Sequence, residues 1–486
     1  MTSQVPDGLY IWWITCQARI MFQTELFELK RKRKEALDRK YKHVFAIHSK
    51  PRTSCLSHEA VDVPSFLGFR NLMVLVLIVG NLRLVMENYM KVGLIATLGL
   101  SYGFIISLQH DIRADDIRMG ALLYFLIPAH LFVAYLIEIV AASQARLAQS
   151  RTKKDEEPPK LRAAWLLIAC AHAVNATLSL GVANYVVYYN IHHPMVGTLC
   201  EFHAVIVWMK QLSYAFTNRD LRDAYLEGYP TPEIYASCPY PHNITLKNLC
   251  YFWWAPTLVY QPVYPRSPRF RRSFFLKRVA EAVGLSLAIW FLSAQYAVPT
   301  LRNSLHAMDK LNLPVILERL MKLSTISLVI WLAGFFALFQ SGLNALAELL
   351  RFGDREFYTD WWNSGSLGTY WKLWNKPVYH FMRRHIYAPL VGRGVNPRAA
   401  SIIVFTFSAF LHELLVGVPT HNIIGVAFAG MMFQIPLIAI TAPLEKGRMS
   451  VIGNVIFWVA FCLVGQPLAV LLYFFAWQAK YGRMKS

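Results

Sequence analysis

The sequence has 486 residues, of which 55% are hydrophobic and 14% aromatic, whereas only 16% are charged. This composition excludes an ordinary soluble domain and indicates one large domain that lies mostly in lipid. The net charge of +20 comes without a nucleic-acid-binding motif, and the basic residues gather beside apolar runs. It therefore indicates cytosolic loops at an anionic membrane surface and no nucleic-acid partner.

The N-terminal residues 1–65 are predicted to form a basic cytosolic tail, and residues 66–486 a single membrane domain. We expect no cleavable signal peptide, because the chain becomes strongly basic at Lys30 to Lys34 before any long apolar run. The seven cysteines are odd in number and lack CxxC spacing, so neither a disulfide framework nor a metal site is indicated.

Nine apolar runs are long enough to cross a bilayer: 71–90, 119–142, 163–189, 195–216, 279–298, 325–350, 400–418, 424–443 and 451–477. The run 93–110 contains three glycines and follows the first too closely, so we interpret it as interfacial or re-entrant. With nine spans and a cytosolic N-terminus, most Lys and Arg residues lie on the cytosolic face, as the positive-inside rule requires. These patterns predict an all-α polytopic protein with about nine transmembrane helices.

The loop 351–399, which this topology places in the cytosol, mixes aromatic and polar residues. It contains the string FYTDWWN at 357–363 and a second aromatic stretch from Tyr370 to Pro377. An interfacial aromatic belt would explain the density of rings. Asp and Asn among tryptophans instead suit a ligand with a flat base, a polar arm and an acyl tail.

A histidine lies inside the apolar run 400–418. His412 is about twelve residues into the helix, or about 18 Å along it, and thus near mid-membrane. Ionisable residues at that depth usually face a cavity or a pathway, although a packing histidine is the alternative. Ser408 at i−4 is placed to orient the ring through its other nitrogen, whereas Glu413 is turned about 100° away.

Two amides also lie in apolar runs, Gln434 before Ile435-Pro436 and Gln466 directly before Pro467. The residue before a proline is biased away from the helix, so we expect a kink at Pro467. Both glutamines are interpreted either as ligand contacts or as interhelical hydrogen-bonding residues.

Taken as strings, these features resemble a known family. FYTDWWN fits the FYxDWWN motif of the sterol and diacylglycerol branch of the membrane-bound O-acyltransferases, and His412 resembles their buried histidine. Further strings resemble the diacylglycerol acyltransferase side of this branch: NLRL with EN at 81–88, APTL at 255–258, PRSPR at 265–269, SAFLHE at 408–413 and GQP at 465–467. The resemblance runs from about residue 66 to 481. Lys372 and Leu414 depart from the family pattern.

This resemblance implies a buried reaction chamber in the endoplasmic reticulum membrane and transfer of a fatty acyl group from acyl-CoA to diacylglycerol. His412 would be the general base, and Asn375 the hydrogen-bond donor at the thioester. The residues implied to bind acyl-CoA are Phe357, Tyr358, Asp360, Trp361, Trp362, Asn363, Trp371, Lys372, Trp374, Val378 and Tyr387. Those implied to support the acceptor or the histidine are Ser408, Glu413, Gln434 and Gln466.

A thioester is already activated, so we expect no cofactor, no metal and no nucleophilic cysteine. The expected partners are acyl-CoA, diacylglycerol, membrane lipids and further copies of the chain, in a homodimer or homotetramer as in similar enzymes. A sterol O-acyltransferase remains the nearest alternative, and wax-ester or retinyl-ester synthesis is also open. A non-catalytic transporter or scaffold would explain the hydrophobicity, and it would retain its function without His412.

Overall fold

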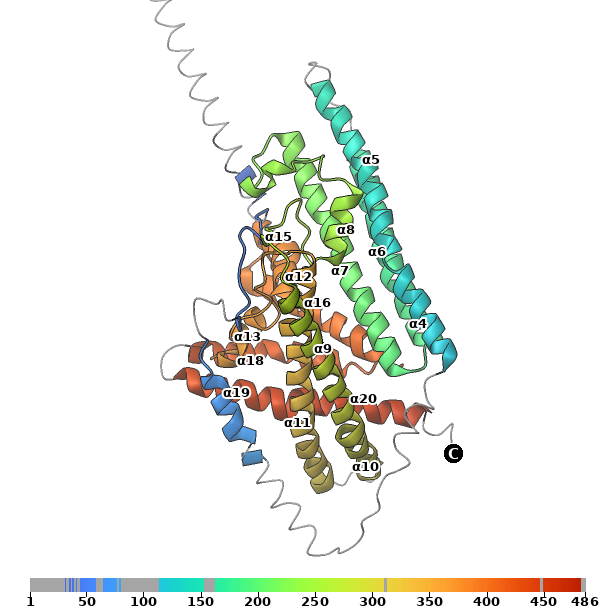
Figure 1. Ribbon diagram of the computed structural model, residues 1–486, viewed down its shortest axis with the longest axis vertical. Coiled ribbons are helices and arrows are strands. Elements are labelled where there is room, and N and C mark those ends of the chain that lie inside the picture. Colours follow the sequence, from blue (N-terminus) through green and yellow to red (C-terminus); the bar gives the residue numbers. More distant parts are fainter. Residues whose placement is uncertain are drawn as a thin grey trace, which may run out of the picture.

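The computed structural model describes residues 44–57, 64–76, 78–79, 113–152, 162–309, 313–445 and 449–481, with five positions between 31 and 41. Within these ranges every regular element is a helix, and extended segments meet only in isolated bridges (Figure 1). The predicted all-α class is confirmed. The run 93–110 and most of the predicted tail lie outside the described residues.

Four long helices form a bundle along one side of the molecule (Figure 1): α4 (Ala114–Leu126), α5 (Ala129–Thr152), α6 (Arg162–Asn190) and α7 (Pro194–Glu227). A turn at Ile127 and Pro128 divides the predicted span 119–142, because proline has no N–H for the helical hydrogen bond. The helix α7 packs against α4, α5, α6 and α16, so it is the inner helix that borders the rest of the protein.

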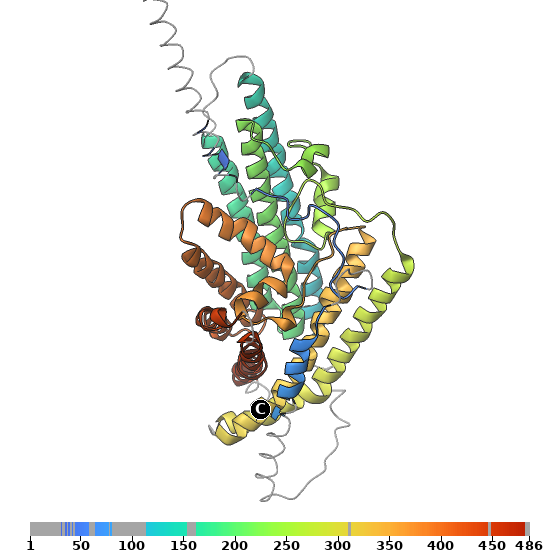
Figure 2. The ribbon, with the colours of Figure 1, turned by 90° about the vertical axis from the view of Figure 1, so that its left-hand side faces the viewer.

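A second group follows in the chain: α9 (Arg272–Leu292), α10 (Val298–Asp309), α11 (Leu313–Phe335) and α12 (Leu343–Leu349). The helices α9 and α11 run side by side (Figures 1 and 2). Short π-helical turns join α9 to α10, at Ser293–Ala297, and α11 to α12, at Phe336–Gly342. The widened turn before α12 carries Leu338 and Phe339, which line the cavity described below.

The C-terminal group contains α16 (Pro397–Gly417), α17 (Val426–Met432), α18 (Gln434–Thr441), α19 (Ser450–Val459) and α20 (Gln466–Tyr481). A π-helical stretch, Ala460–Gly465, separates α19 from α20 where the sequence predicts a kink. Pro467 provides no N–H to the preceding turn, which accounts for the irregular helical hydrogen bonding at this point.

Shorter helices occupy the two polar connections. The first connection carries η1 (Glu233–Ser237) and α8 (Leu246–Trp254). The loop 351–399 is itself largely helical, with η4 (Trp361–Asn363), α13 (Leu367–Leu373), α14 (Lys376–Met382), η5 (Arg383–Tyr387) and α15 (Ala388–Gly392). These short helices give the loop a fixed shape on which side chains can be placed.

Six helices in the described part of the chain are long and apolar enough to cross a membrane: Ala114–Ser150, Ala163–Asn190, Leu313–Leu349, Pro397–Gly417, Val426–Glu445 and Ser450–Lys480. A polytopic membrane protein is therefore confirmed, but the number nine is not. The predicted spans 195–216 and 279–298 are helical but are not among these six. The predicted span 71–90 continues past the described residues, and only Leu67–Val76 is seen as a short apolar helix.

Residues 44–57, here called the N-terminal strap, lie against the membrane domain. The His48 ring joins two distant segments, with Nδ1 2.8 Å from Asp354 Oδ2 and Nε2 2.7 Å from Thr257 Oγ1. Arg52 also donates to Asp354 Oδ2, at 2.8 Å. Burial acts to raise the pKa of the Asp354 carboxyl, but the hydrogen bond from His48 and the charge of Arg52 outweigh it and lower the pKa. This part of the predicted tail is thus a structural element of the domain.

Candidate active site

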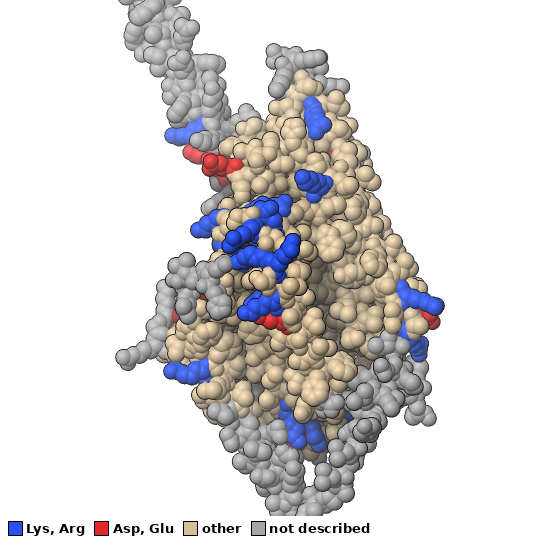
Figure 3. Space-filling view, in the orientation of Figure 1, with Lys and Arg blue, Asp and Glu red and all other residues tan. Residues whose placement is uncertain are grey.

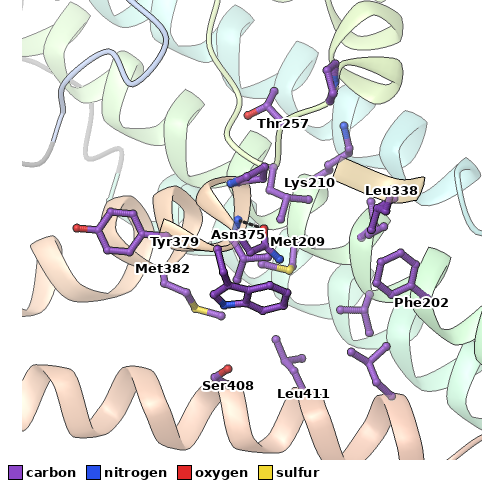
Figure 4. Close-up of a pocket in the computed structure, with 18 of the residues that line it drawn as sticks. Phe202, Met209, Lys210, Thr257, Leu338, Asn375, Tyr379, Met382, Ser408 and Leu411 are labelled. Atoms are coloured by element: carbon purple, nitrogen blue, oxygen red, sulfur yellow. Dashed lines mark hydrogen bonds between the residues drawn. The ribbon is translucent and has the colours of Figure 1, made fainter. Parts of the chain in front are cut away.

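A cavity of about 1030 Å³ lies where α7, the segment after α8, α12, the helices of loop 351–399 and α16 converge. Figure 4 shows side chains facing one another across it, among them Phe202 and Met209 of α7, Leu411 of α16, and Leu338 of the π-helical turn before α12. Most of the lining is apolar, with a small number of polar groups. A volume of this size is at the upper end of ordinary ligand sites and suits a long apolar ligand.

His412 borders this cavity from α16. Its Nδ1 is 2.7 Å from the backbone oxygen of Ser408, and 3.4 Å from the Ser408 hydroxyl. A carbonyl oxygen can only accept, so Nδ1 carries the proton and Nε2 keeps its lone pair. Among the described residues Nε2 has no hydrogen-bond partner. The sequence predicted that the Ser408 side chain orients the ring, whereas the shorter contact is to the Ser408 backbone.

Asn375 lines the same cavity at the N-terminus of α14. Its Oδ1 accepts a hydrogen bond from the backbone N–H of Val378 at 3.2 Å, so Asn375 is the N-cap of this helix. The cap holds the amide in one orientation and leaves its NH₂ group without a partner among the described residues. A neutral donor is therefore presented on the cavity that His412 also borders (Figure 4).

The family model described as MBOAT, membrane-bound O-acyltransferase family, matches residues 162–475, which include both His412 and Asn375. This chain belongs to that family. It is therefore an acyltransferase, and the predicted membership and enzyme class are confirmed.

Three relatives show how far the similarity extends. Diacylglycerol O-acyltransferase 1A of Glycine max is 36% identical over 89% of this chain and 82% of its own length. Diacylglycerol O-acyltransferase 1 of Arabidopsis thaliana is 36% identical over 89% of this chain and 78% of its own length. Diacylglycerol O-acyltransferase 1 of Dictyostelium discoideum is 36% identical over 87% of this chain and 64% of its own length.

Five of the residues expected at acyl-CoA lie on the cavity of this acyltransferase: Trp371, Lys372, Trp374, Val378 and Tyr387. They come from α13, α14 and η5, so the short helices of loop 351–399 form one wall. The ring of Trp371 stands perpendicular to that of His412, with centroids 6.5 Å apart. The wall and the histidine of α16 are thus in direct contact.

The FYTDWWN motif occupies a different place. Its aromatic residues are buried in the core, where the Trp361 ring meets those of Trp331, Phe335, Tyr370 and Trp458. In the described part of the chain, none of residues 357–363 lines the cavity. Direct contact of the motif with acyl-CoA therefore stays a prediction.

The backbone of the motif supports the wall instead. The carbonyl of Phe357 accepts from Lys376 N–H at 3.0 Å, and Thr359 N–H donates to the carbonyl of Leu373 at 3.0 Å. These two bonds bracket Asn375. At its other end, Asn363 Oδ1 accepts from Gly68 N–H at 2.8 Å, which ties the motif to the helix Leu67–Val76.

Glu413 faces away from the cavity, as the helical geometry predicts. Its carboxylate accepts from the N–H groups of Gly425 at 2.8 Å and Phe428 at 3.1 Å, and from the Tyr473 hydroxyl at 2.7 Å. These bonds satisfy the N-terminus of α17 and join α16 to α17 and α20. Glu413 therefore holds the helix that carries His412.

Replacing Glu413 with Gln should destabilise this junction. The amide NH₂ of Gln would face N–H and O–H donors, so at least one charge-assisted hydrogen bond, worth about 1.5–3 kcal/mol, is lost. We expect a lower midpoint of thermal unfolding in detergent, and lower activity because the orientation of α16 relaxes. Glu233→Gln, the same change at an exposed residue of η1, is the control. An unchanged midpoint for Glu413→Gln would contradict this role.

The two glutamines lie outside the cavity lining. Gln434 donates to the carbonyl of Gly430 at 3.2 Å within its own helical segment. Gln466 is half-buried at the start of α20. Their predicted contact with the acceptor therefore stays a prediction.

The structure adds functional candidates that the sequence did not single out. Lys210, His203 and Thr257 border the cavity, as does Arg383 at the start of η5. Lys210 could have been noticed as a cation inside an apolar run. Thr257 lies in the string APTL at 255–258, which resembles the family but carried no expected role, because only the folded chain brings this segment to the cavity.

Proposed function

We propose that this acyltransferase transfers a fatty acyl group from acyl-CoA to the free hydroxyl of diacylglycerol, giving triacylglycerol and free CoA. The observation that carries the proposal is one large apolar cavity bordered by His412 Nε2 and the amide NH₂ of Asn375, neither of which has a hydrogen-bond partner in the described part of the chain. The relatives, all diacylglycerol O-acyltransferases by name, point to the acceptor.

The proposed chemistry begins at the acceptor hydroxyl. His412 Nε2 takes the hydroxyl proton while the oxygen attacks the thioester carbonyl carbon. Negative charge then develops on the carbonyl oxygen, where the NH₂ group of Asn375 donates a hydrogen bond. Collapse of this tetrahedral species breaks the C–S bond, and the imidazolium returns its proton to the leaving CoA sulfur. No acyl-enzyme and no cofactor enter this sequence, since the thioester supplies the activation.

Charge on the cavity wall supports a polyanionic donor. The described lining contains the cations Lys210, Lys372 and Arg383 and no Asp or Glu. In Figure 3, Lys and Arg side chains gather in the middle of the face shown, whereas the helical bundle beside them carries few charges. We infer that the charged part of CoA lies toward Lys372 and Arg383, with the acyl chain in the apolar part.

We further propose the endoplasmic reticulum membrane as the location, with a cytosolic N-terminus and loop 351–399 on the cytosolic face. This orientation places the loop where water-soluble acyl-CoA is available, while diacylglycerol diffuses within the bilayer. A homodimer or homotetramer is the proposed assembly.

The acceptor is tested by offering labelled oleoyl-CoA with diacylglycerol or with cholesterol to microsomes containing the chain. Labelled triacylglycerol is the expected product. Labelled steryl ester without triacylglycerol would assign the chain to the sterol branch instead. Lack of any ester from either acceptor, despite normal expression, would contradict the proposed function.

A further inference from the structure

Lys210 is a buried cation on α7 that borders the cavity. Its Nζ donates to the backbone oxygens of Phe252 at 2.9 Å and Ala255 at 2.7 Å, and it lies 4.9 Å from the centre of the Phe252 ring. Among the described residues no carboxylate forms an ion pair with it. An ammonium group removed from water without a counter-ion is costly, and such a group in an apolar segment commonly has a function.

The two oxygens belong to the C-terminal end of α8. The Ala255 oxygen also accepts from Thr257 N–H at 2.7 Å, whereas the helix offers the Phe252 oxygen no N–H at the usual position. The carbonyl of Phe252 would normally bond to the N–H four residues later, but that residue is Pro256, which has none. Ala255 is the C-cap residue of α8. A cation at a helix C-terminus is favourable because it meets the negative end of the helix dipole. Lys210 therefore acts as a clamp on the end of α8.

Phe252 directly precedes the wall segment, residues 253–258, and Ala255 belongs to it; every residue of this segment borders the cavity. One turn further along the same face of α7, Ser213 secures the end of this segment. Its Oγ accepts from Tyr260 N–H at 2.8 Å and lies 2.7 Å from Nε2 of His385, in η5. Lys210 and Ser213, one turn apart on the same face of α7, thus position the wall segment. Through His385, Ser213 also positions η5, which carries Arg383 and Tyr387.

We propose that Lys210 is a positioning residue for acyl transfer. By clamping the oxygens of Phe252 and Ala255, it holds the wall segment at the spacing from His412 and Asn375 at which the two substrates meet. Its charge matters because charge-assisted hydrogen bonds are about twice as strong as neutral ones. The inference rests on the proposed function only for the identity of the substrates.

The first test compares Lys210→Met and Lys210→Arg with the native chain. Methionine retains the apolar stem but removes the donor to the Phe252 carbonyl and leaves the Ala255 carbonyl with the Thr257 N–H alone. Displaced reactants lower the rate steeply, so we expect kcat to fall about 10- to 100-fold with a smaller change in KM for oleoyl-CoA. Arginine can bond both oxygens, so it should recover part of kcat. Lys247→Met, the same change at an exposed position of α8, should leave kcat unchanged.

Hydrogen–deuterium exchange of the full-length protein in detergent provides a second readout. In Lys210→Met, amides of residues 252–260 should exchange faster while those of α16 keep their native rate. Faster exchange over the whole protein, together with no recovery of kcat in Lys210→Arg, would show that Lys210 only stabilises the fold and would overturn the proposal. A native kcat in Lys210→Met would overturn it as well. If the native chain made no triacylglycerol, the proposed function would fail, whereas the exchange comparison would still test the clamp.

Discussion

His412→Ala should lower triacylglycerol synthesis by about 10²- to 10⁴-fold at matched expression, because the acceptor hydroxyl then has no base to take its proton. The measurement is the initial rate of labelled triacylglycerol formation from oleoyl-CoA and diacylglycerol. Binding of acyl-CoA should change little, since the imidazole acts on the other substrate.

A suitable control is His242→Ala, which changes an exposed histidine in the connection before α8. It should show native rates. His412→Gln adds a second comparison, because an amide can keep the hydrogen bond to the Ser408 carbonyl but is a negligible base at neutral pH. Triacylglycerol formation at the native rate in either His412 variant would exclude the proposed mechanism.

Asn375→Asp should lower kcat by about 10²- to 10³-fold, the usual cost of removing one donor to a developing oxyanion. Aspartate keeps the oxygen that caps α14 at the Val378 N–H, so the helix should remain formed. Its carboxylate, however, offers no N–H and places negative charge where the carbonyl oxygen becomes negative. The change separates the donor role of Asn375 from its capping role.

The matched control is Asn396→Asp. Asn396 caps α16 in the same way, with its Oδ1 accepting from Arg398 N–H at 2.9 Å, but its side chain is exposed and does not line the cavity. Both variants should unfold near the native temperature, and only Asn375→Asp should lose activity. Equal kcat for Asn375→Asp and the native chain would rule out Asn375 as the donor at the thioester.

The sequence by itself determined the all-helical membrane class and the family resemblance, and it singled out His412, which borders the cavity. These properties depend on local order along the chain, namely the length of apolar runs, the string FYTDWWN and the position of one polar residue in a helix. Hydropathy along the sequence predicted nine spans, a number that the structure does not confirm. The predicted spans 195–216 and 279–298 are helical but are not among the six helices that are long and apolar enough to cross a membrane.

Only the tertiary structure decided which side chains share the cavity. The wall segment 253–258 is far from His412 in sequence, and its place at the cavity depends on long-range bonds such as those of Lys210 and His48. The tertiary structure also decided the role of FYTDWWN, the strongest motif in the sequence. Its rings are buried and its backbone bonds flank Asn375, whereas none of its residues in the described chain lines the cavity. A motif records which residues are needed, whereas packing determines whether they touch the ligand or hold the residue that does.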